Sequence, residues 1–534
     1  MKLYKYVYMN KWFLIFCVLI VLTSCKSVEN YNVKITSLHT IEDLRTDVDK
    51  VYNQLKKHHP KLYQYTPKSV LDFKIDSLKK SITTPINSRA FYKKLAPVIT
   101  HVRQGHISVG SANKRFSKKE FKRLKKNTFE FYNLDFEYLN DKLWVTHTRG
   151  KDSTYIGSEV VKINDELVAD LVKTYKTRFT SDGYNKTLYN RVVGRHFSTF
   201  YYKDKGVVDS LKITLKNKDS LFTKTLKRIP KKKKRVFNDS LKVEKPKKRT
   251  KEEIRLAKIK SKQQKKENRK RGFYAKRKEY NRNLDFIGKD STVAYMKIRS
   301  FTKTNYKRFY KESFKKIDSA KTKHFVLDLR DNGGGRVAEI DYLYSYLIDK
   351  EYQFIEESEV NSRVLFLKSL MSNSNPMALK IIGGLFTPVI VAGSLLHTKK
   401  KDDKLYFKFK QTKVRQPKDL NFKGKMYVLI NGKSFSASSL ISTHLKAEKR
   451  AVFVGEETGG AYNGCVAGFY KIYKLPTSKL KVRIGLMQIE APQKQSPDGY
   501  GIKPDVEIIP TIEDRLSNED PELNWVLDDI YKKD

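Results

Sequence analysis

The chain has 534 residues, of which 110 are lysine or arginine and 58 are aspartate or glutamate, giving a formal net charge of +52. This length is enough for two to four domains, and a hydrophobic content of 39% excludes a wholly disordered protein. Three cysteines are too few for a small scaffold held together by disulfide bonds.

The first 25 residues predict a lipoprotein signal peptide. Three lysines precede an apolar run over residues 12–22, which is too short for a comfortable membrane span. The run closes with the letters LTSC, which resemble the lipobox of bacterial lipoproteins and imply lipidation of Cys25. An ordinary signal peptide or an uncleaved anchor is the alternative. With Cys17 removed and Cys25 lipidated, Cys465 is left alone, so we expect no intramolecular disulfide bond.

A helical domain is expected over residues 38–110. The stretch 41–60 places its apolar residues on one helical stripe, and Pro60 ends that helix. A second helix is expected to begin after Asn87, which is a suitable N-cap.

Residues 128–228 alternate more like strands. The segment 159–163 predicts a strand, followed by a turn at 164–165 and a helix with Leu167, Leu171 and Val172 facing inward. This stretch is similar to the Gly-Asp-x-Ile-x-x-Ile-Asn-Gly region of PDZ domains, with departures at Glu159 and at 165–166. The resemblance implies a PDZ-like domain.

A basic linker is expected over residues 229–283. Within it, residues 231–282 hold 24 basic and 6 acidic residues and no apolar stripe wide enough to bury, so the segment is disordered or a solvated helix. One interpretation is an inert linker. The other is attachment to anionic lipid headgroups, where each basic residue contributes about 1 kcal/mol. Nucleic acid is not the expected partner, because an exported lipoprotein would seldom meet the chromosome.

Residues 284–510 have α/β character, and residues 511–534 are expected to form a C-terminal tail. Apolar, β-branched runs alternate with helical segments, which predicts a buried sheet flanked by helices. One of these runs enters Gly333, Gly334 and Gly335 and leaves as a helix, so backbone N–H groups can line a concavity there. Phosphate-loop and dinucleotide spacings are absent, which favours an oxyanion site if a nucleophile lies nearby.

The stretch "VLINGKSFSASSLISTHL" offers that nucleophile. A strand over residues 426–431 and a helix from about Ala437 place Ser436 at their junction. A hydroxyl there gains from the helix dipole, and the N–H of Ala437 can serve as an oxyanion donor. A plain helix cap is the alternative role for this serine.

Five segments together resemble a known family. "FVLDLRDNGGG", "VLINGKSFSAS", "VGEETGG" and "GYGIKPDVEI" resemble, in this order, the motifs of the tail-specific or C-terminal processing serine peptidases and their tricorn-type relatives. Upstream, "VRQGHISV" looks like the segment that carries the catalytic histidine in tricorn-type members. The resemblance implies a ClpP/crotonase-like peptidase core over residues 284–510, preceded by the helical and PDZ-like domains.

The roles implied by this resemblance fall on named residues. Ser436 matches the nucleophile, but Ala461 stands where the processing branch has its lysine base, so a Ser/Lys dyad is not expected. His106 matches the tricorn-type histidine and has a suitable pKa range for a base. It follows Gly105, where serine or aspartate is usual in the family. Asp498 matches the acidic residue that orients the histidine.

The oxyanion hole would combine the N–H of Ala437 with that of Gly333 or Gly334. Each site residue has a structural alternative: His106 as a core histidine and Asp498 as a turn residue. Asp328 is expected to be structural, either pairing with Arg330 or capping the glycine loop. No histidine or cysteine spacing of a metal site is present.

The sequence therefore predicts a lipid-anchored serine endopeptidase of the bacterial cell envelope, on an outer-membrane or periplasmic face. It would cut unfolded or flexible polypeptides through an acyl-enzyme, without a cofactor. The alternative is a catalytically inactive peptide-binding or scaffolding lipoprotein on the same fold.

Overall fold

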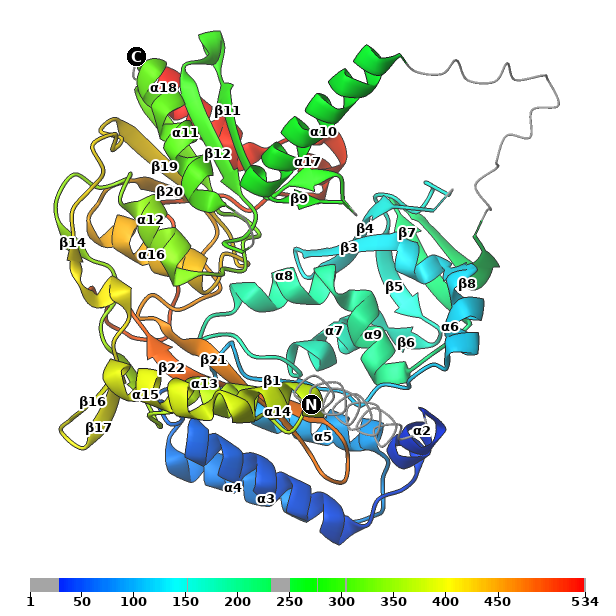
Figure 1. The fold of residues 1–534 in the computed structure, drawn as a ribbon. Helices are drawn as coiled ribbons and strands as arrows, with labels where there is room; N and C mark the ends of the chain where they lie inside the picture. Colours follow the sequence, from blue (N-terminus) through cyan, green and yellow to red (C-terminus); the bar gives the residue numbers. More distant parts are fainter. Residues whose placement is uncertain (1–27, 151, 232–249, 276, 303–304, 533–534) are drawn as a thin grey trace, which may run out of the picture.

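A computed structural model describes residues 28–150, 152–231, 250–275, 277–302 and 305–532 (Figure 1). The expectations for the signal peptide and for Cys25 lie outside these residues. Within them, an α/β core occupies one side of the molecule, the middle domain the other, and the N-terminal helices lie beneath both in the view of Figure 1.

The N-terminal part of the described chain is helical. It contains α2 (Val28–Thr36), α3 (Ile41–His58), α4 (Lys68–Lys80) and α5 (Ser88–Ile99). The side chain of Asn87 caps α5 by accepting hydrogen bonds from the N–H groups of Arg89 and Ala90. Apolar residues of these helices are buried with Leu475, Leu480 and Val482 of the core domain, so the two domains share one hydrophobic cluster.

The middle domain is a seven-stranded antiparallel sheet covered by three helices. The strands are β2 (Asn127–Phe129), β3 (Leu134–Leu139), β4 (Lys142–Thr148), β5 (Glu159–Ile163), β6 (Glu166–Leu167), β7 (Ser210–Asn217) and β8 (Ser220–Pro230). The helices are α7 (Val168–Lys176), α8 (Thr187–Arg195) and α9 (Phe197–Lys205). The predicted strand 159–163 is confirmed, and so is the following turn. The inward position of Leu167 is wrong: this side chain is 46% exposed because it precedes α7, while Leu171 and Val172 are buried.

The basic linker contains the solvated helix that its composition allowed. Helix α10 (Lys251–Arg271) has no buried residue and begins with a capping box between Thr250 and Glu253. Its role at anionic headgroups stays a prediction.

The core domain is built on a six-stranded sheet with the order β11-β12-β13-β19-β20-β23. Its strands are β11 (Arg282–Ile287), β12 (Val293–Ile298), β13 (His324–Asp328), β19 (Lys425–Ile430), β20 (Val452–Gly455) and β23 (Val506–Glu507). All neighbours are parallel except β11 and β12. The helices α11 (Tyr306–Ser319), α12 (Val337–Tyr344) and α16 (Ala437–Ala447) cover one face. This arrangement confirms the α/β prediction.

The other face of this sheet is covered by the segment expected to be a tail. Residues 511–534 contribute α17 (Ile512–Ser517) and α18 (Pro521–Tyr531). Val526 and Ile530 of α18 are buried against Val326, Tyr427 and other side chains of the sheet. The segment is therefore part of the core domain, because without α18 these sheet residues would face water.

A second sheet joins the helical domain to the core domain. Its order is β1-β22-β15-β17-β16, and β21 also pairs with β22. The strands are β1 (Ser108–Gly110), β15 (Ser358–Val360), β16 (Thr398–Lys401), β17 (Lys404–Phe407), β21 (Cys465–Lys474) and β22 (Lys481–Ile489). Strand β1 pairs antiparallel with β22, with Ser108 opposite Arg483. The predicted histidine at position 106 is thus fixed to the core domain two residues before this pairing.

Candidate active site

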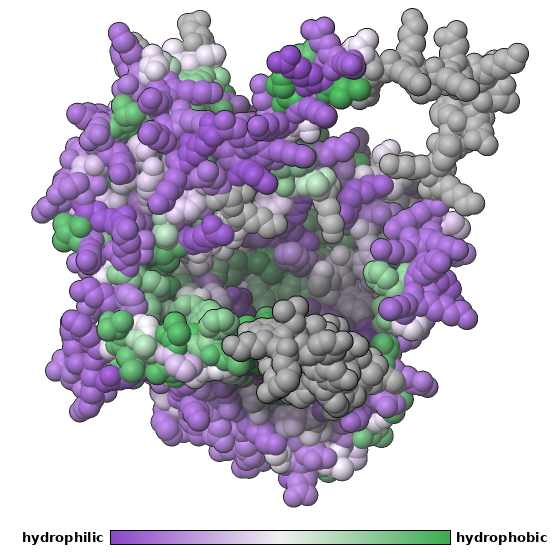
Figure 2. Space-filling view, in the orientation of Figure 1, coloured by the Kyte–Doolittle hydropathy of each residue, from purple (hydrophilic) through white to green (hydrophobic). Residues whose placement is uncertain are grey.

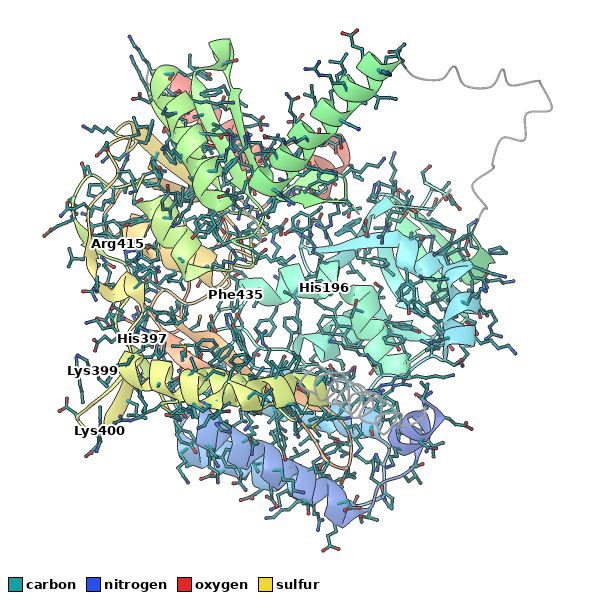
Figure 3. All side chains as sticks on the ribbon, viewed as in Figure 1. His196, His397, Lys399, Lys400, Arg415 and Phe435 are labelled. Carbon is teal, nitrogen blue, oxygen red and sulfur yellow. The ribbon has the colours of Figure 1, made fainter. Side chains whose placement is uncertain are left out.

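A cavity of about 710 Å³ lies where the three domains meet (Figure 2). Its walls carry most of the predicted site residues, namely His106, Gly333, Gly334, Ser436 and Ala437, together with Gly105 and Ala461, where the sequence departs from the family pattern. Figure 2 shows the hollow with apolar residues at its base, and Figure 3 labels Phe435 beside it. Residues that are 330 positions apart in the sequence therefore share one concave site.

Ser436 sits on a sharp turn between β19 and α16. Its backbone has φ 58° and ψ −116°, a left-handed conformation that costs a non-glycine residue about 1–3 kcal/mol. Ser436 occupies the N-cap position, yet its side chain makes no capping hydrogen bond. The plain-cap alternative therefore lacks its defining contact, and the hydroxyl is left for the cavity.

Cys465 is the immediate side-chain neighbour of this serine. Burial raises the pKa of the thiol well above its usual range, and the nearby Ser436 side chain opposes part of this increase. The cysteine is free and buried, so it stays a neutral thiol beside the hydroxyl.

The glycine loop approaches Ser436 closely. A Cβ atom on Gly334 would lie 2.8 Å from the backbone nitrogen of Ala437 and 2.8 Å from the Cβ of Ser436, so only glycine fits here. The Gly334 N–H donates to Asn332 Oδ1 at 2.9 Å, which corrects its assignment as an oxyanion donor because this proton is already engaged. Gly333 has open space around the corresponding position. Its N–H and that of Ala437 remain as the candidate pair.

His106 is held in the wall of the cavity by stacking. Its ring lies between Phe435, with centroids 5.0 Å apart, and Tyr470, at 5.9 Å. Burial, with a smaller contribution from the charge of Arg483, lowers the pKa of His106 to about 3. The imidazole is therefore neutral near pH 7, which is the form that a general base requires.

The two predicted catalytic side chains line the same cavity without a hydrogen bond between them among the described contacts. The Nδ1 atom of His106 is buried and has no hydrogen-bond partner there. Catalytic hydrogen bonds are often long in a protein without substrate and shorten when substrate binds. His106 therefore lines the same cavity as Ser436, and contacts with other residues must orient its ring.

Asp498 lies outside the cavity wall. Its carboxylate accepts hydrogen bonds from Gln64 Nε2 at 2.9 Å and from the N–H of Gly499 at 2.6 Å. Gln64 in turn accepts from Gln104 Nε2 at 3.0 Å. The described hydrogen bonds of Asp498 therefore lead toward the histidine-bearing turn through two glutamines. None of them goes directly to His106.

Asp182 is the acidic residue in the cavity wall, and it lies in none of the motifs described above. It comes from the loop between α7 and α8 and is fully buried. Its Oδ1 accepts from the N–H of Gly105 at 2.6 Å, and Oδ2 accepts from the N–H of Ala461 at 3.4 Å. Burial raises the pKa of Asp182 to about 7, and the charge of Asp498 adds to this increase.

The absence of a side chain at Gly105 leaves room for the carboxylate of Asp182. A Cβ atom on Gly105 would lie 2.5 Å from the Phe435 ring and 3.0 Å from Asp182 Oδ1. The space of the missing side chain is thus filled by Phe435 and by the carboxylate of Asp182. The carboxylate of Asp182 thus occupies the space that a serine or aspartate side chain at position 105 would fill.

The remaining acidic and histidine candidates are structural. Asp328 is buried and accepts hydrogen bonds from the backbone and the guanidinium of Arg330, as predicted, and these contacts hold the pKa of Asp328 far below its usual range against the effect of burial. His58 and His59 are buried at the end of α3, where packing is their evident role.

Comparisons with known proteins bear on the family and the fold of the chain. The sequence profile of "Peptidase family S41" matches residues 292–508. The crystal structure of mature CPAF is 13% identical, covers 91% of this chain and 96% of its own, and superposes with a TM-score of 0.56. Mature CPAF complexed with lactacystin gives 13% identity, coverage of 92% and 97%, and a TM-score of 0.57.

The photosystem II D1 C-terminal processing protease is 12% identical and covers 87% of this chain and 93% of its own, with a TM-score of 0.39. The fold comparison therefore depends on the two CPAF structures. Among curated proteins there is no match.

Proposed function

Because the chain belongs to peptidase family S41 through residues 292–508 and is a serine peptidase, we propose that Ser436 is its nucleophile and His106 its general base. The observation that carries this proposal is the strained turn at Ser436, whose side chain faces the shared cavity and caps no helix. A conformation of this cost is retained where the surrounding structure and the chemistry require it.

In the proposed reaction, Ser436 Oγ attacks the carbonyl carbon of a peptide bond and His106 takes the hydroxyl proton. The N–H groups of Gly333 and Ala437 donate to the oxyanion that develops, and losing one such donor costs about 3 kcal/mol. The C–N bond then breaks as His106 returns the proton to the leaving amine. Water hydrolyses the acyl-enzyme with His106 again as base, which regenerates Ser436.

Asp182 is the positioning residue in this proposal, in place of Asp498. Its carboxylate holds the N–H of Gly105 and the N–H of Ala461, so it fixes the turn that carries His106 to the loop beside Ser436. In its ionised form it also places a negative charge near the imidazolium that forms during the reaction, which stabilises that cation.

The proposed substrates are flexible polypeptides. The cavity is walled by Phe409, Phe469 and Tyr470 together with Arg336 and Arg483, which suits an extended chain with apolar side chains and a polar backbone. We place the protein in the bacterial cell envelope with a lipid at Cys25, on the strength of the signal-peptide pattern. The mass of the chain extracted from membranes would reveal that acylation, and an unmodified N-terminus would contradict it.

A fluorophosphonate probe tests the catalytic assignment. The wild-type protein should become labelled at Ser436, while Ser436→Ala should abolish labelling and His106→Ala should slow it by about 10²- to 10⁴-fold. A matched control is Ser438→Ala, whose hydroxyl donates to the carbonyl of Asn332 at 2.8 Å and does not face the reaction. Labelling that persists in Ser436→Ala would refute the nucleophile, and an unlabelled wild-type protein would favour a peptide-binding function.

A further inference from the structure

The helices α14 (Met377–Leu385) and α15 (Thr387–His397) form an apolar surface that the rest of the described chain leaves uncovered. Leu385, Val389 and Leu396 are 75%, 72% and 82% exposed, and α15 has no buried residue. The 21 residues from 377 to 397 include one lysine and no acidic residue. Figure 2 shows these side chains as a hydrophobic area over α13–α15, next to the hollow of the active site. An apolar area of this kind on a protein surface marks an interaction site.

No single helix among the described residues is long and apolar enough to cross a bilayer, and the two helices of this pair are bent by 70° relative to each other. At 1.5 Å per residue, they are about 14 and 17 Å long, against a hydrocarbon thickness of about 30 Å. Neither helix therefore crosses a bilayer alone, and their exposed apolar side chains can instead enter the layer between headgroups and acyl chains.

A basic border follows the apolar surface. Residues 398–410 contain six lysines and two aspartates. They form β16 and β17 directly after α15, and Figure 3 shows Lys399 and Lys400 at the outer edge of the molecule there. Apolar side chains bordered by lysines match the two layers of a membrane surface, acyl chains and phosphate headgroups.

A short series of contacts connects this surface to the start of the described chain. Asn373, four residues before α14, exchanges two hydrogen bonds with the backbone of Lys474 at 2.8 and 2.6 Å. The Lys474 ammonium lies 5.6 Å from the centre of the Tyr31 ring in α2. Val28, where α2 begins, is three residues after Cys25, so a lipid there would be at most about 11 Å away along the chain.

We propose that α14 and α15 lie in the interface of a lipid bilayer, with their apolar side chains among the acyl chains and the lysines of residues 398–410 at the headgroups. The neighbouring lipid at Cys25, which belongs to the proposed function, would make this the second membrane contact of the protein. A lipid at Cys25 would attach only the start of the chain, and a second contact would set which face of the protein lies against the bilayer.

This orientation places the active-site cavity next to the membrane. Helix α13 (Leu365–Leu370) packs beneath the pair, and its Phe366 meets Phe469 edge to face, with ring centroids 5.9 Å apart. Phe469 lines the cavity. Polypeptides that emerge from or lie on the bilayer are therefore the substrate class that this arrangement favours. Helix α10 projects from the opposite side of the molecule in Figure 1, so it cannot provide the same contact.

The test uses the chain from residue 26 onward, which keeps every described residue and carries no lipid. It is sedimented with phosphatidylcholine vesicles at high salt, where attraction of the basic segments to charged surfaces is screened. The wild-type chain should sediment with the vesicles. Replacing Leu385, Val389 and Leu396 together by glutamine should lower the bound fraction at least about tenfold, because three apolar side chains no longer enter the bilayer.

The matched control replaces Leu38, Phe73 and Leu221 by glutamine, three side chains of similar exposure elsewhere on the surface, and should bind like wild type. Fluorophosphonate labelling in solution should be equal in all three proteins. The proposal is refuted if the wild-type chain stays in the supernatant or binds only anionic vesicles at low salt, or if the control loses binding equally. If the wild-type chain is a dimer without vesicles and the triple variant is a monomer, the surface would be assigned to a second copy of the chain. The chain from residue 26 carries no lipid, and vesicle binding needs no catalysis. The sedimentation result is therefore independent of whether the proposed function is correct.

Discussion

Asp182 has two hydrogen bonds that tie together parts of the chain otherwise far apart in the sequence. One reaches Gly105 beside His106 and the other reaches Ala461 in the loop beside Ser436. Because burial raises the pKa of Asp182 to about 7, its ionisation falls in the range where the enzyme would work. The pKa of His106, lowered to about 3, lies well outside that range. A change in activity near neutral pH would therefore report on Asp182.

We predict that kcat/KM rises as the pH increases through about 7, because the ionised carboxylate accepts both N–H groups and stabilises the imidazolium. Asp182→Asn should lose this rise and keep a low activity on both sides of it. The measurement is a pH profile of kcat/KM with a flexible peptide substrate.

The control for this profile is Asp498→Asn. This variant should keep the rise but move it to lower pH, because the charge of Asp498 contributes to the raised pKa of Asp182. If the rise survives in Asp182→Asn, another group titrates and the positioning role is wrong. A purely structural Asp182 would change thermal stability without changing the shape of the profile.

The sequence indicated Ser436 and His106 because each lies in a short segment whose order is typical of a family. Asp182 has no such segment. It lies in a turn in the middle domain, 77 positions from Gly105, and only folding brings the two together. Asp498 was predicted from its place in a motif, yet its contacts go to Gln64 and Gly499. Residue type and motif order thus point to a candidate nucleophile and base, whereas the group proposed to position them is found only in the folded chain.

Among the elements, α18 shows what a motif-based interpretation leaves out. The helix has Leu523, Val526, Leu527 and Ile530 at helical spacing, a pattern that predicts one buried face. The family motifs end before it, so the segment 511–534 was expected to be a tail. In the structure Val526 and Ile530 are almost fully buried against the central sheet. Four strands of the core sheet, β12, β13, β19 and β20, are in contrast evident from their apolar β-branched runs.

We predict that Ile530→Ala lowers the free energy of unfolding by about 2–5 kcal/mol, the usual cost of truncating a large buried aliphatic side chain. Urea unfolding followed by circular dichroism measures this change. The control is Leu516→Ala in α17, which removes a side chain that is 43% exposed and should cost less than about 1 kcal/mol. Equal losses in the two variants would mean that α18 does not complete the core.

For the whole molecule, the loop 180–187 of the middle domain is the point where three domains are joined. Thr180 Oγ1 donates to the carbonyl of Ile107 in the histidine-bearing segment at 2.6 Å. Asn185 Nδ2 donates to the carbonyl of Thr458 in the core domain at 2.9 Å. The middle domain is therefore a structural part of the active site, whether or not it binds peptides as a PDZ-like domain would.

We predict that Asn185→Ala slows fluorophosphonate labelling of Ser436 by about tenfold, because a buried carbonyl of the core domain loses its partner and the loop that carries Asp182 loosens. The control is Thr223→Ala in the same domain, which removes an exposed hydroxyl pair with Thr214 and should label at the wild-type rate. Unchanged labelling in Asn185→Ala would show that the loop has no part in forming the site.

The residues at this three-domain junction are also synthesised at different times. The proposed base His106 precedes the proposed positioning residue Asp182 and the proposed nucleophile Ser436 in the chain, so a fragment that ends before Ser436 lacks a complete site. Activity can arise only after the last domain has folded against the first two. We therefore expect the peptidase to be inactive until these three segments have folded together.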